Sequence, residues 1–262
     1  MATEPTLVAA APTMTGAPGR TDDEAPGLPG AVGISLLRVY SQTAKDTVVG
    51  GTPHVHLVCS EGYYVIGGTG AVSTLTRAGS AMVPLIAGSV TWFTPGTVHR
   101  LVNDGDLEIL TLMQNGGLPE AGDAVLTFPS AILEDPEHYD RLSKLRPDAT
   151  IQDAFRRRDL AVDGLHELQA AVDRDGHAAL ESFYQAAAEI VRPRLQRWRA
   201  LWEKGARRSA QDTADQIDRL HDSDVSYLLD ASVETRSGPV ETGRLGMCGV
   251  LEVYPTPAHE EA

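Results

Sequence analysis

The chain has 262 residues, enough for one large domain or for a barrel with an accessory unit. Its formal net charge of −14 argues against nucleic acid or an anionic membrane as a general partner. Two cysteines are too few for a disulfide framework and no apolar run is long enough to span a membrane, so we expect a cytoplasmic protein.

The first strand is expected only after an N-terminal tail. Residues 1–29 are rich in Ala, Pro, Thr and Gly, and such a segment buries too little apolar surface to offset the entropy lost on ordering. We expect a disordered tail there and a second short tail at residues 257–262. The run GISLLRVY, from Gly33 to Tyr40, is typical of a first strand, and residues 47–49 are predicted to form a second.

Residues 50–103 contain four potential metal ligands. His54 and His56 are two residues apart, and in a strand, where side chains alternate, both point to one face. Their apolar neighbours and the preceding Gly and Pro residues favour a strand over a helix. Glu61 enters the next predicted strand after a short connection, so its carboxylate is expected to converge on the two imidazoles.

A third imidazole reaches the same face from a second predicted hairpin. Residues 90–93 and 98–102 are expected to be strands joined by a turn at Pro95-Gly96, and the returning strand carries His99. Three neutral imidazoles and one carboxylate suit one divalent transition metal ion, with iron favoured and Mn, Ni, Zn, Cu or Co as alternatives. A lone histidine in a strand is usually a surface or a satisfied core residue. Four ligands in register within two glycine-bounded hairpins favour metal binding instead.

The spacing of these residues resembles the two motifs of the cupin superfamily, G-x5-H-x-H-x(3,4)-E-x6-G and G-x5-P-x-G-x2-H-x3-N. Eight positions match at the family spacings: His54, His56, Glu61, Gly68, Gly88, Gly96, His99 and Asn103. Two turn positions depart from the motifs, because Val48 stands where the first begins with Gly and Thr94 where the second has Pro. The resemblance covers roughly residues 35–115 and implies a mononuclear metalloprotein with a small jelly-roll barrel. It also implies a homodimer, because some cupins pair an N-terminal strand with a neighbouring subunit.

We expect a mainly β protein with added helices. Residues 30–130 are predicted to form the cupin jelly-roll β-barrel, closed by a strand at residues 107–113. The hydrophobic period then changes from 2 to 3.6, which predicts a helical accessory region at residues 131–235, divided at Pro193. Its amphipathic helices must bury their apolar stripes against each other, the barrel or a second subunit. Residues 236–256 alternate again and are predicted to form a C-terminal strand that packs on the barrel.

Several other side chains are candidates for a role or have a plain structural explanation. Tyr63 lies two residues after Glu61 and shares its inward face, so both are catalytic candidates, although Tyr63 also suits core packing. Asn103 shares the face of the third imidazole and is a candidate to support a ligand. Cys59 is expected to pack in the core, and the arginines at residues 156–158 are expected to face solvent.

Three functions fit such a site. An octahedral ion held by three imidazoles and one carboxylate keeps two neighbouring positions free, so the favoured function is an Fe(II)-type oxygenase acting on a small, oxygen-bearing substrate. The runner-up is a metal-dependent sugar or keto-acid isomerase or epimerase in which Glu61 or Tyr63 moves a proton. The third is a non-catalytic cupin that binds a small ligand, and the fold alone does not decide among them.

Overall fold

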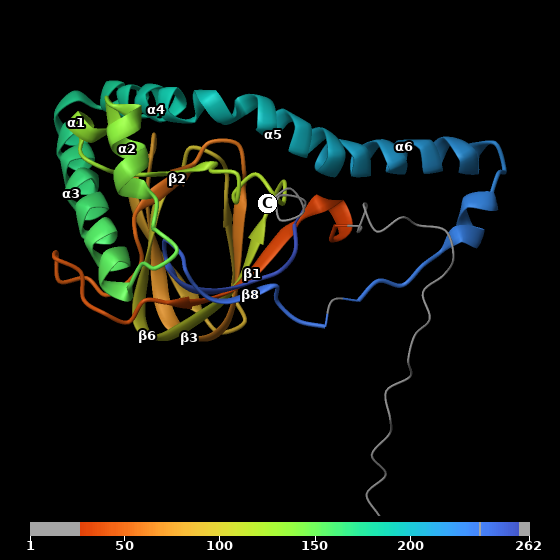
Figure 1. Ribbon diagram of the computed structural model, residues 1–262, viewed down its shortest axis with the longest axis horizontal. Coiled ribbons are helices and arrows are strands. Elements are labelled where there is room, and N and C mark those ends of the chain that lie inside the picture. The colour runs from red at the N-terminus through yellow and green to blue at the C-terminus, as the bar shows by residue number, and fades with distance from the viewer. Residues whose placement is uncertain (1–26, 236, 257–262) are drawn as a thin grey trace, which may run out of the picture.

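The computed structural model describes residues 27–235 and 237–256, so the two predicted tails lie almost wholly outside the described residues. The described strands form one nine-stranded sheet that is rolled into a barrel (Figure 1). Its main path is β4-β3-β6-β1-β9-β8, with β2 pairing β6 and β7, and β5 pairing β3. The strands are β1 (Gly33–Val39), β2 (His54–His56), β3 (Glu61–Thr76), β4 (Gly79–Ile86), β5 (Val90–Phe93), β6 (Val98–Met113), β7 (Ala124–Leu126), β8 (Glu241–Leu245) and β9 (Gly249–Val253).

Two long strands, β3 and β6, hold the barrel together by pairing along most of their length. Each has 16 residues, and their register shifts three times between Val65 and Gly70. Such irregularities bend a strand, which lets β3 pair β5 at its start and β4 at its end. Gly68 lies in this bend at φ +73°, and a Cβ there would meet the Asp106 carbonyl oxygen at 2.2 Å. The motif glycine is therefore required by the curvature of the barrel.

Two strand predictions differ from the structure. The strand expected at 107–113 is the second half of β6, continuous with the strand that carries His99. The strand expected at 47–49 does not form: Thr47 has φ +69°, and the segment contributes an isolated bridge between Thr43 and Val49. A positive φ at a β-branched residue interrupts an extended chain.

The helices cover one side of the barrel and then leave it (Figure 1). The α-helices are α1 (Ser130–Leu133), α2 (Pro136–Ser143), α3 (Ile151–Asp175), α4 (His177–Val191), α5 (Leu195–Trp202) and α6 (Arg208–His221). The shorter helical turns are η1 (Pro29–Ala31), η2 (Arg192–Arg194), η3 (Glu203–Arg207) and η4 (Ser226–Asp230). The predicted division at Pro193 is confirmed, since that residue lies in η2 between α4 and α5.

Two apolar cores lie on the two faces of the barrel wall. One fills the barrel and includes Val65, Leu101 and Ile109. The other lies between the wall and the helices, where Val55 of β2 and Val125 of β7, which are opposite each other, belong to one cluster with residues of α3, α4 and α5. The strand β2 is therefore buried on both of its faces.

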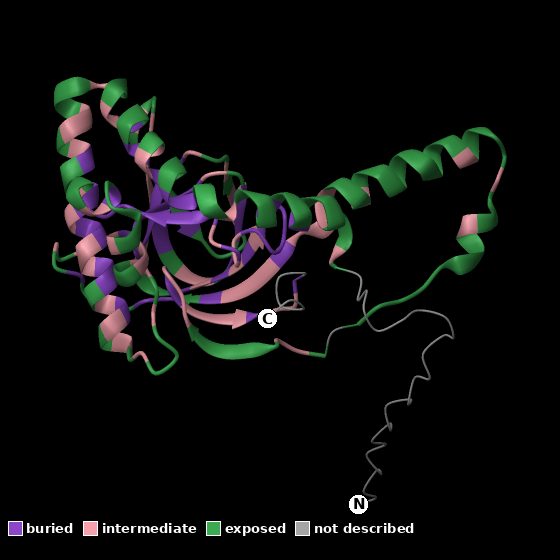
Figure 2. Ribbon diagram, turned by 45° about the horizontal axis from the view of Figure 1, so that its top comes forward, coloured by how far each residue is buried: buried purple, intermediate pink, exposed green. Residues whose placement is uncertain are grey.

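The helix α6 leaves its predicted apolar stripe uncovered by the barrel or by another described helix, so burial against a second subunit is the alternative that stays untested. It extends beyond the barrel and is exposed along its length (Figure 2). Ile217 and Leu220, which belong to the predicted stripe, are 62% and 50% exposed. No segment of the described chain covers them, and the homodimer stays a prediction.

The C-terminal segment returns to the barrel, as predicted. Strand β9 pairs antiparallel with β1, from Gly249 opposite Val39 to Val253 opposite Ser35. The expected single strand is a hairpin, because β8 precedes β9 across a turn that contains Gly246. No helix among the described residues is long and apolar enough to cross a membrane, and the cytoplasmic location stays a prediction.

The prediction that the arginines at 156–158 all face solvent is wrong for two of them. Arg158 is 1% exposed and donates hydrogen bonds to the carbonyl oxygens of Gln42, Thr43 and Gly50. Arg157 is also buried and donates to the carbonyl oxygens of Ser143 and Gly246. A helical stripe of charge cannot reveal these acceptors, because they are backbone carbonyl groups of other segments: the end of α2 and loops distant in the sequence. These two side chains fasten α3 to the barrel.

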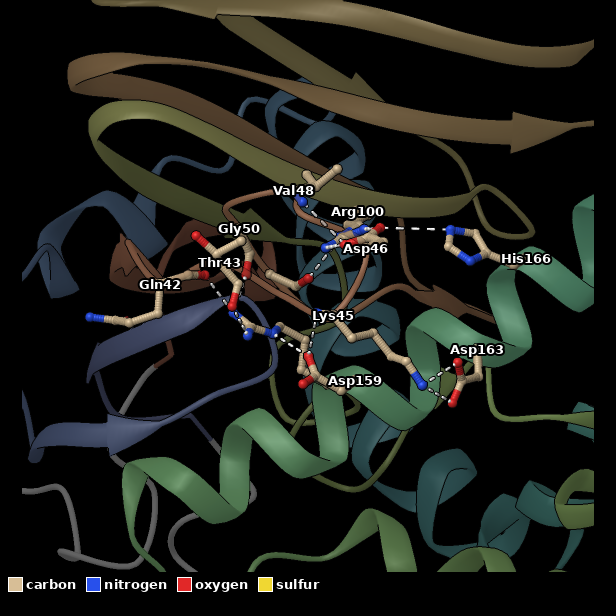
Figure 3. Close-up of polar contacts among 12 residues, drawn as sticks. Gln42, Thr43, Lys45, Asp46, Val48, Gly50, Arg100, Asp159, Asp163 and His166 are labelled. Atoms are coloured by element: carbon tan, nitrogen blue, oxygen red, sulfur yellow. Dashed lines mark hydrogen bonds and ion pairs between the residues drawn. The ribbon is translucent and has the colours of Figure 1, made fainter.

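Residues 42–51, which contain the acceptors of Arg158, form a loop that is also bound from the barrel side. The cation on that side is Arg100 of β6 (Figure 3). Its guanidinium forms a bidentate pair with Asp46 and donates to the Gly51 carbonyl oxygen at 3.1 Å. His166 of α3 lies 3.7 Å from the same carboxylate. On the exposed side, Lys45 pairs with Asp163 of α3. The loop that leads into β2 is thus held between β6 and α3.

We expect Arg158→Met to lower the free energy of unfolding by at least about 2 kcal/mol, since the variant removes a buried charged group that donates to three carbonyl oxygens. Arg156→Met is the matched control, because Arg156 is exposed and pairs only with Asp153 at the helix surface. It is expected to cost about 0.5 kcal/mol or less. Urea unfolding of both variants measures the difference, and equal costs would contradict the buried role of Arg158.

The Asp46–Arg100 pair predicts a pH dependence of stability. Burial alone would raise the pKa of Asp46, but the hydrogen bonds and charge of Arg100 outweigh it and lower the pKa below its ordinary value. A carboxyl with a lowered folded-state pKa contributes stability that is complete above its unfolded-state pKa, about 4, and is lost as pH falls through the folded-state pKa. The difference in urea midpoint between the wild type and Asp46→Asn should be constant near neutral pH and shrink below about pH 4. Exposed Asp148 supplies the control substitution, Asp148→Asn, whose difference should stay near zero throughout.

Candidate metal centre

The four predicted ligands meet inside the barrel. His54 and His56 are the two ends of β2, Glu61 begins β3, and His99 lies near the start of β6. His54 and His99 are opposite each other across the β2–β6 pair, which places their side chains on one face. All four side chains are buried. The shared face that the sequence predicted is the barrel interior.

The ligand atoms lie within reach of a single ion. One atom from each of the four residues can be chosen so that all lie within 4.8 Å of one another. Glu61 Oε2 is 3.1 Å from His99 Nε2 and 3.3 Å from His56 Nε2. Transition-metal bonds of about 2.1 Å at right angles separate neighbouring donor atoms by about 3 Å, which matches these two distances.

Hydrogen bonds fix the ring orientation of all three imidazoles. Their Nδ1 atoms lie against oxygens at 2.9–3.0 Å, the acceptors being the Thr52 carbonyl for His54, Asp123 Oδ2 for His56 and the Thr97 carbonyl for His99. A carbonyl oxygen only accepts, so Nδ1 of His54 and of His99 carries the hydrogen. In the neutral ring Nε2 then has a free lone pair, the form in which histidine binds a metal.

Two of the converging atoms lack a partner among the described residues. Glu61 Oε2 and His99 Nε2 are fully buried, and neither has a hydrogen bond of acceptable geometry despite their short separation. Buried polar atoms without partners are costly and uncommon in folded proteins. A cation between them would satisfy both, so the donor set fits one divalent transition metal ion.

The electrostatics of the cluster also favour a cation. Burial and the neighbouring His99 and His56 rings hold the pKa of His54 well below its usual range. Burial lowers the pKa of His56 too, but the flanking carboxylates of Asp123 and Glu61 outweigh it and raise the pKa to about 9. For Glu61, burial would raise the pKa, but the neighbouring His56 and His99 rings outweigh it and hold the pKa well below normal. The site therefore holds an ionised carboxylate facing imidazole nitrogens.

Asp123 is a functional residue that the sequence analysis missed. It is fully buried just before β7, and it accepts hydrogen bonds from His56 and from the backbone N–H groups of Leu57, Val58 and Cys59. A lone Asp before a short apolar run gave no signal, because it is 67 residues from His56. A carboxylate on the remote nitrogen of a ligand histidine fixes the ring and makes it a stronger ligand.

Tyr63 points into the barrel, as expected for a residue two positions after Glu61. It is 0% exposed, its ring lies 5.5 Å from that of Phe93, and its hydroxyl has no hydrogen-bond partner among the described residues. Burial and the Glu61 carboxylate raise its pKa well above the usual range, so the phenol is neutral. The Phe93 ring also lies 4.4 Å from His99.

The other two candidates have structural roles. Asn103 does not support a ligand: its amide donates to the Val39 carbonyl oxygen and accepts from the N–H groups of Gly105 and Leu107. It thereby closes the irregular bend of β6. Cys59 is buried, and burial raises the pKa of its thiol, which agrees with the packing interpretation.

The turn of the second motif is hydrogen-bonded both to β2, which carries two of the ligands, and to helix α4. Gly96 has φ +85°, a conformation that favours glycine, and its N–H donates to the His56 carbonyl oxygen at 2.9 Å. The hydroxyl of Tyr184 in α4 donates to the Gly96 carbonyl oxygen at 2.6 Å. A chain of hydrogen bonds therefore runs from the helical layer to a ligand strand.

We expect Asp123→Asn to lower metal affinity about 10- to 100-fold while all four ligands remain, because His56 loses the carboxylate that orients it. Competition with a chromophoric chelator measures the change. Asp163→Asn is the control, since Asp163 pairs with Lys45 on the surface of α3. Unchanged affinity in Asp123→Asn would mean that His56 is positioned without this carboxylate.

No protein-family profile matches the chain, and no curated protein matches its sequence. A double-stranded β-helix protein from Klebsiella pneumoniae is 17% identical over 32% of this chain and 68% of its own, with a TM-score of 0.27. A cupin 2 conserved barrel domain protein from Salinispora arenicola is 21% identical over 34% of this chain and 67% of its own, also at 0.27. A mutant of oxalate decarboxylase from Bacillus subtilis is 19% identical over 32% of this chain, at 0.27, and the match spans only 21% of that enzyme.

The structural neighbours are thus cupin and double-stranded β-helix proteins, each similar to about a third of this chain. The positions of the two histidine motifs are the stronger observation, since their ligands meet at one point inside a rolled antiparallel sheet. The chain contains a rolled antiparallel β-sheet with a buried His-His-Glu-His cluster in its interior.

Proposed function

We propose that this protein is a mononuclear metal-dependent enzyme that acts on a small, oxygen-bearing substrate, and that it is an Fe(II)-type oxygenase. The observation that carries the proposal is the buried cluster of three imidazoles and one carboxylate. His54, His56, Glu61 and His99 would hold the ion and leave part of its coordination to a small substrate. Iron bound there would supply the activation of dioxygen, and nitrogen and carboxylate ligands suit iron.

The residues of the chain would bind, orient and shield the reactants. The imidazoles are held by their Nδ1 hydrogen bonds, so they need no rearrangement when a substrate arrives. Phe93 and the apolar core of the barrel exclude water from one side of the cluster. Glu61 is the carboxylate that faces the Nε2 atoms of His56 and His99, and it is our candidate to accept a substrate proton.

A metal-dependent isomerase or epimerase is the second candidate, and one observation favours it. The Tyr63 hydroxyl is buried near the Glu61 carboxylate and makes no hydrogen bond of acceptable geometry in the part of the chain that the structure describes. A neutral phenol and an ionised carboxylate at one metal site would suit proton transfer to and from a carbonyl compound. A binder without turnover is the third alternative.

We expect His99→Ala to reduce metal content from about one ion per chain to below about 0.1, because the remaining ligands cannot enclose the ion. His138→Ala is the control, since the partly exposed His138 lies near the start of α2 and is not one of the four clustered residues. Elemental analysis after purification without added metal gives both contents. Full occupancy in the His99→Ala protein would show that the ion binds elsewhere.

Oxygen consumption separates the candidate functions. We expect the Fe(II)-loaded protein to consume oxygen in the presence of small hydroxy- and keto-acid substrates and to be inactive without air. Turnover under anaerobic conditions would favour the isomerase. Tight binding of one of these substrates without turnover, in air or without it, would favour the non-catalytic binding protein. An oxygen electrode and product analysis by mass spectrometry are the measurements.

A further inference from the structure

Buried hydroxyl groups without a partner gather on the segments that carry the metal ligands. Among the described residues, the buried hydroxyls that lack a hydrogen bond are those of Thr52, Tyr63 and Thr111. Thr52 precedes His54 by two residues, Tyr63 follows Glu61 by two, and Thr111 lies on the strand of His99. Leaving a hydroxyl buried and unpaired costs stability, so such a group suggests a missing partner.

Tyr63 and Thr111 are neighbours on the inner wall of the barrel. They are opposite each other in the β3–β6 pair. Glu61 and Met113, which are also opposite each other, lie two residues away along the same strands and on the same face. Opposite residues of an antiparallel pair project to the same face with their Cβ atoms about 4.5–5.5 Å apart. Tyr63 is 0% exposed and Thr111 is 5% exposed. Both hydroxyls therefore belong to the barrel interior, one position beyond a metal ligand.

The chain pairs buried hydroxyls elsewhere, which makes these two unusual. Thr127 is as buried as Thr111, and its hydroxyl contacts the carbonyl oxygens of Pro53 and Ala161. Tyr139 is as buried as Tyr63, and its hydroxyl accepts from the Leu126 N–H. Packing alone would be served equally well by Phe and Val at positions 63 and 111.

We infer that Tyr63 and Thr111 form a two-hydroxyl subsite that binds one oxygen of the substrate while another substrate oxygen binds the metal. The inference rests on the proposed function and specifies its substrate as a small molecule with two oxygens close together, such as a hydroxy acid, keto acid or dicarboxylate. The second oxygen is a carbonyl or carboxylate acceptor, because two hydroxyls can both donate to it. The sheet holds both side chains, and Phe93 packs against the Tyr63 ring, so the subsite is formed before the ligand arrives.

Stability measurements on the full chain test whether the hydroxyls are structural. We expect Tyr63→Phe and Thr111→Val to leave the Tm unchanged or slightly raised, because each removes an unpaired buried hydroxyl. The matched variants Tyr139→Phe and Thr127→Val remove bonded hydroxyls and should lower the Tm by about 2–4 °C each. An equal loss in all four variants would overturn the inference, since it would show that Tyr63 and Thr111 are bonded within the fold.

Ligand binding without turnover tests the subsite itself. Zinc-loaded wild type would be titrated calorimetrically with oxalate, lactate and pyruvate, which carry two close oxygens, and with azide, which binds a metal but offers no oxygen. We expect Tyr63→Phe and Thr111→Val each to weaken the best oxygen ligand about 3- to 10-fold, with azide affinity and zinc content unchanged.

The outcomes separate this inference from the proposed function. Equal affinity of the variants and the wild type for the oxygen ligands would overturn the subsite and leave the metal centre standing. Loss of azide binding together with oxygen-ligand binding in the variants would also overturn it, because the hydroxyls would then act on the metal. A wild type that takes up no zinc, or that binds zinc but neither azide nor any oxygen ligand, would count against the proposed function and the subsite together.

Discussion

The candidate metal centre depends on the buried carboxylate of Asp123, which supports the cluster without belonging to it. A carboxylate without access to water must be surrounded by donors, and here it accepts from His56 and from three consecutive backbone N–H groups. These bonds tie the end of β2 to the segment that leads into β7. They also determine which nitrogen of His56 faces Glu61. The same interaction thus shapes the loop before Glu61 and orients one ligand, so the cluster cannot be separated from the local fold.

The other two imidazoles are fixed by the backbone. The carbonyl oxygens of Thr52 and Thr97 each accept a hydrogen bond from Nδ1 of the histidine two residues later in the chain. This local geometry needs no distant partner. His56 differs, because its acceptor comes from another part of the chain. Its own pKa is raised by two carboxylates, whereas that of His54 is lowered by burial and neighbouring charge. The cluster therefore combines two ligands that are preset by their own strands with one that is set by tertiary structure.

This difference explains how much of the site could be predicted from sequence. The period of two in His54 and His56, and the spacing to Glu61 and His99, suffice to place four ligands on one inner face, because alternation is a local property of strands. Asp123 carries no such signal, since its role depends on a contact between distant segments. The burial of Arg157 and Arg158 could not be predicted for the same reason. Their acceptors include backbone carbonyl groups of distant loops, and every residue has such a group. The two strands expected at 98–102 and 107–113 are one strand, β6, because irregular pairing near Gly68 bends it without ending it. The motif identified Gly68 but did not predict this bend.

The helices help to hold β2 in place, because this strand is too short to be held by its own strand pairing. This strand has three residues and meets β6 at one register position and β7 at three, so few ladder hydrogen bonds hold it. Between its two ligands, Val55 faces outward into the core shared with the helices. The Tyr184 hydroxyl reaches Gly96, whose N–H binds the His56 carbonyl oxygen, and Thr127 bonds both Pro53 and Ala161. Because a ligand is useful only when held close to its productive geometry, packing from outside must supply the rigidity that a three-residue strand lacks. The helices are therefore part of the structure that makes the metal centre, although none of the four ligands lies on them.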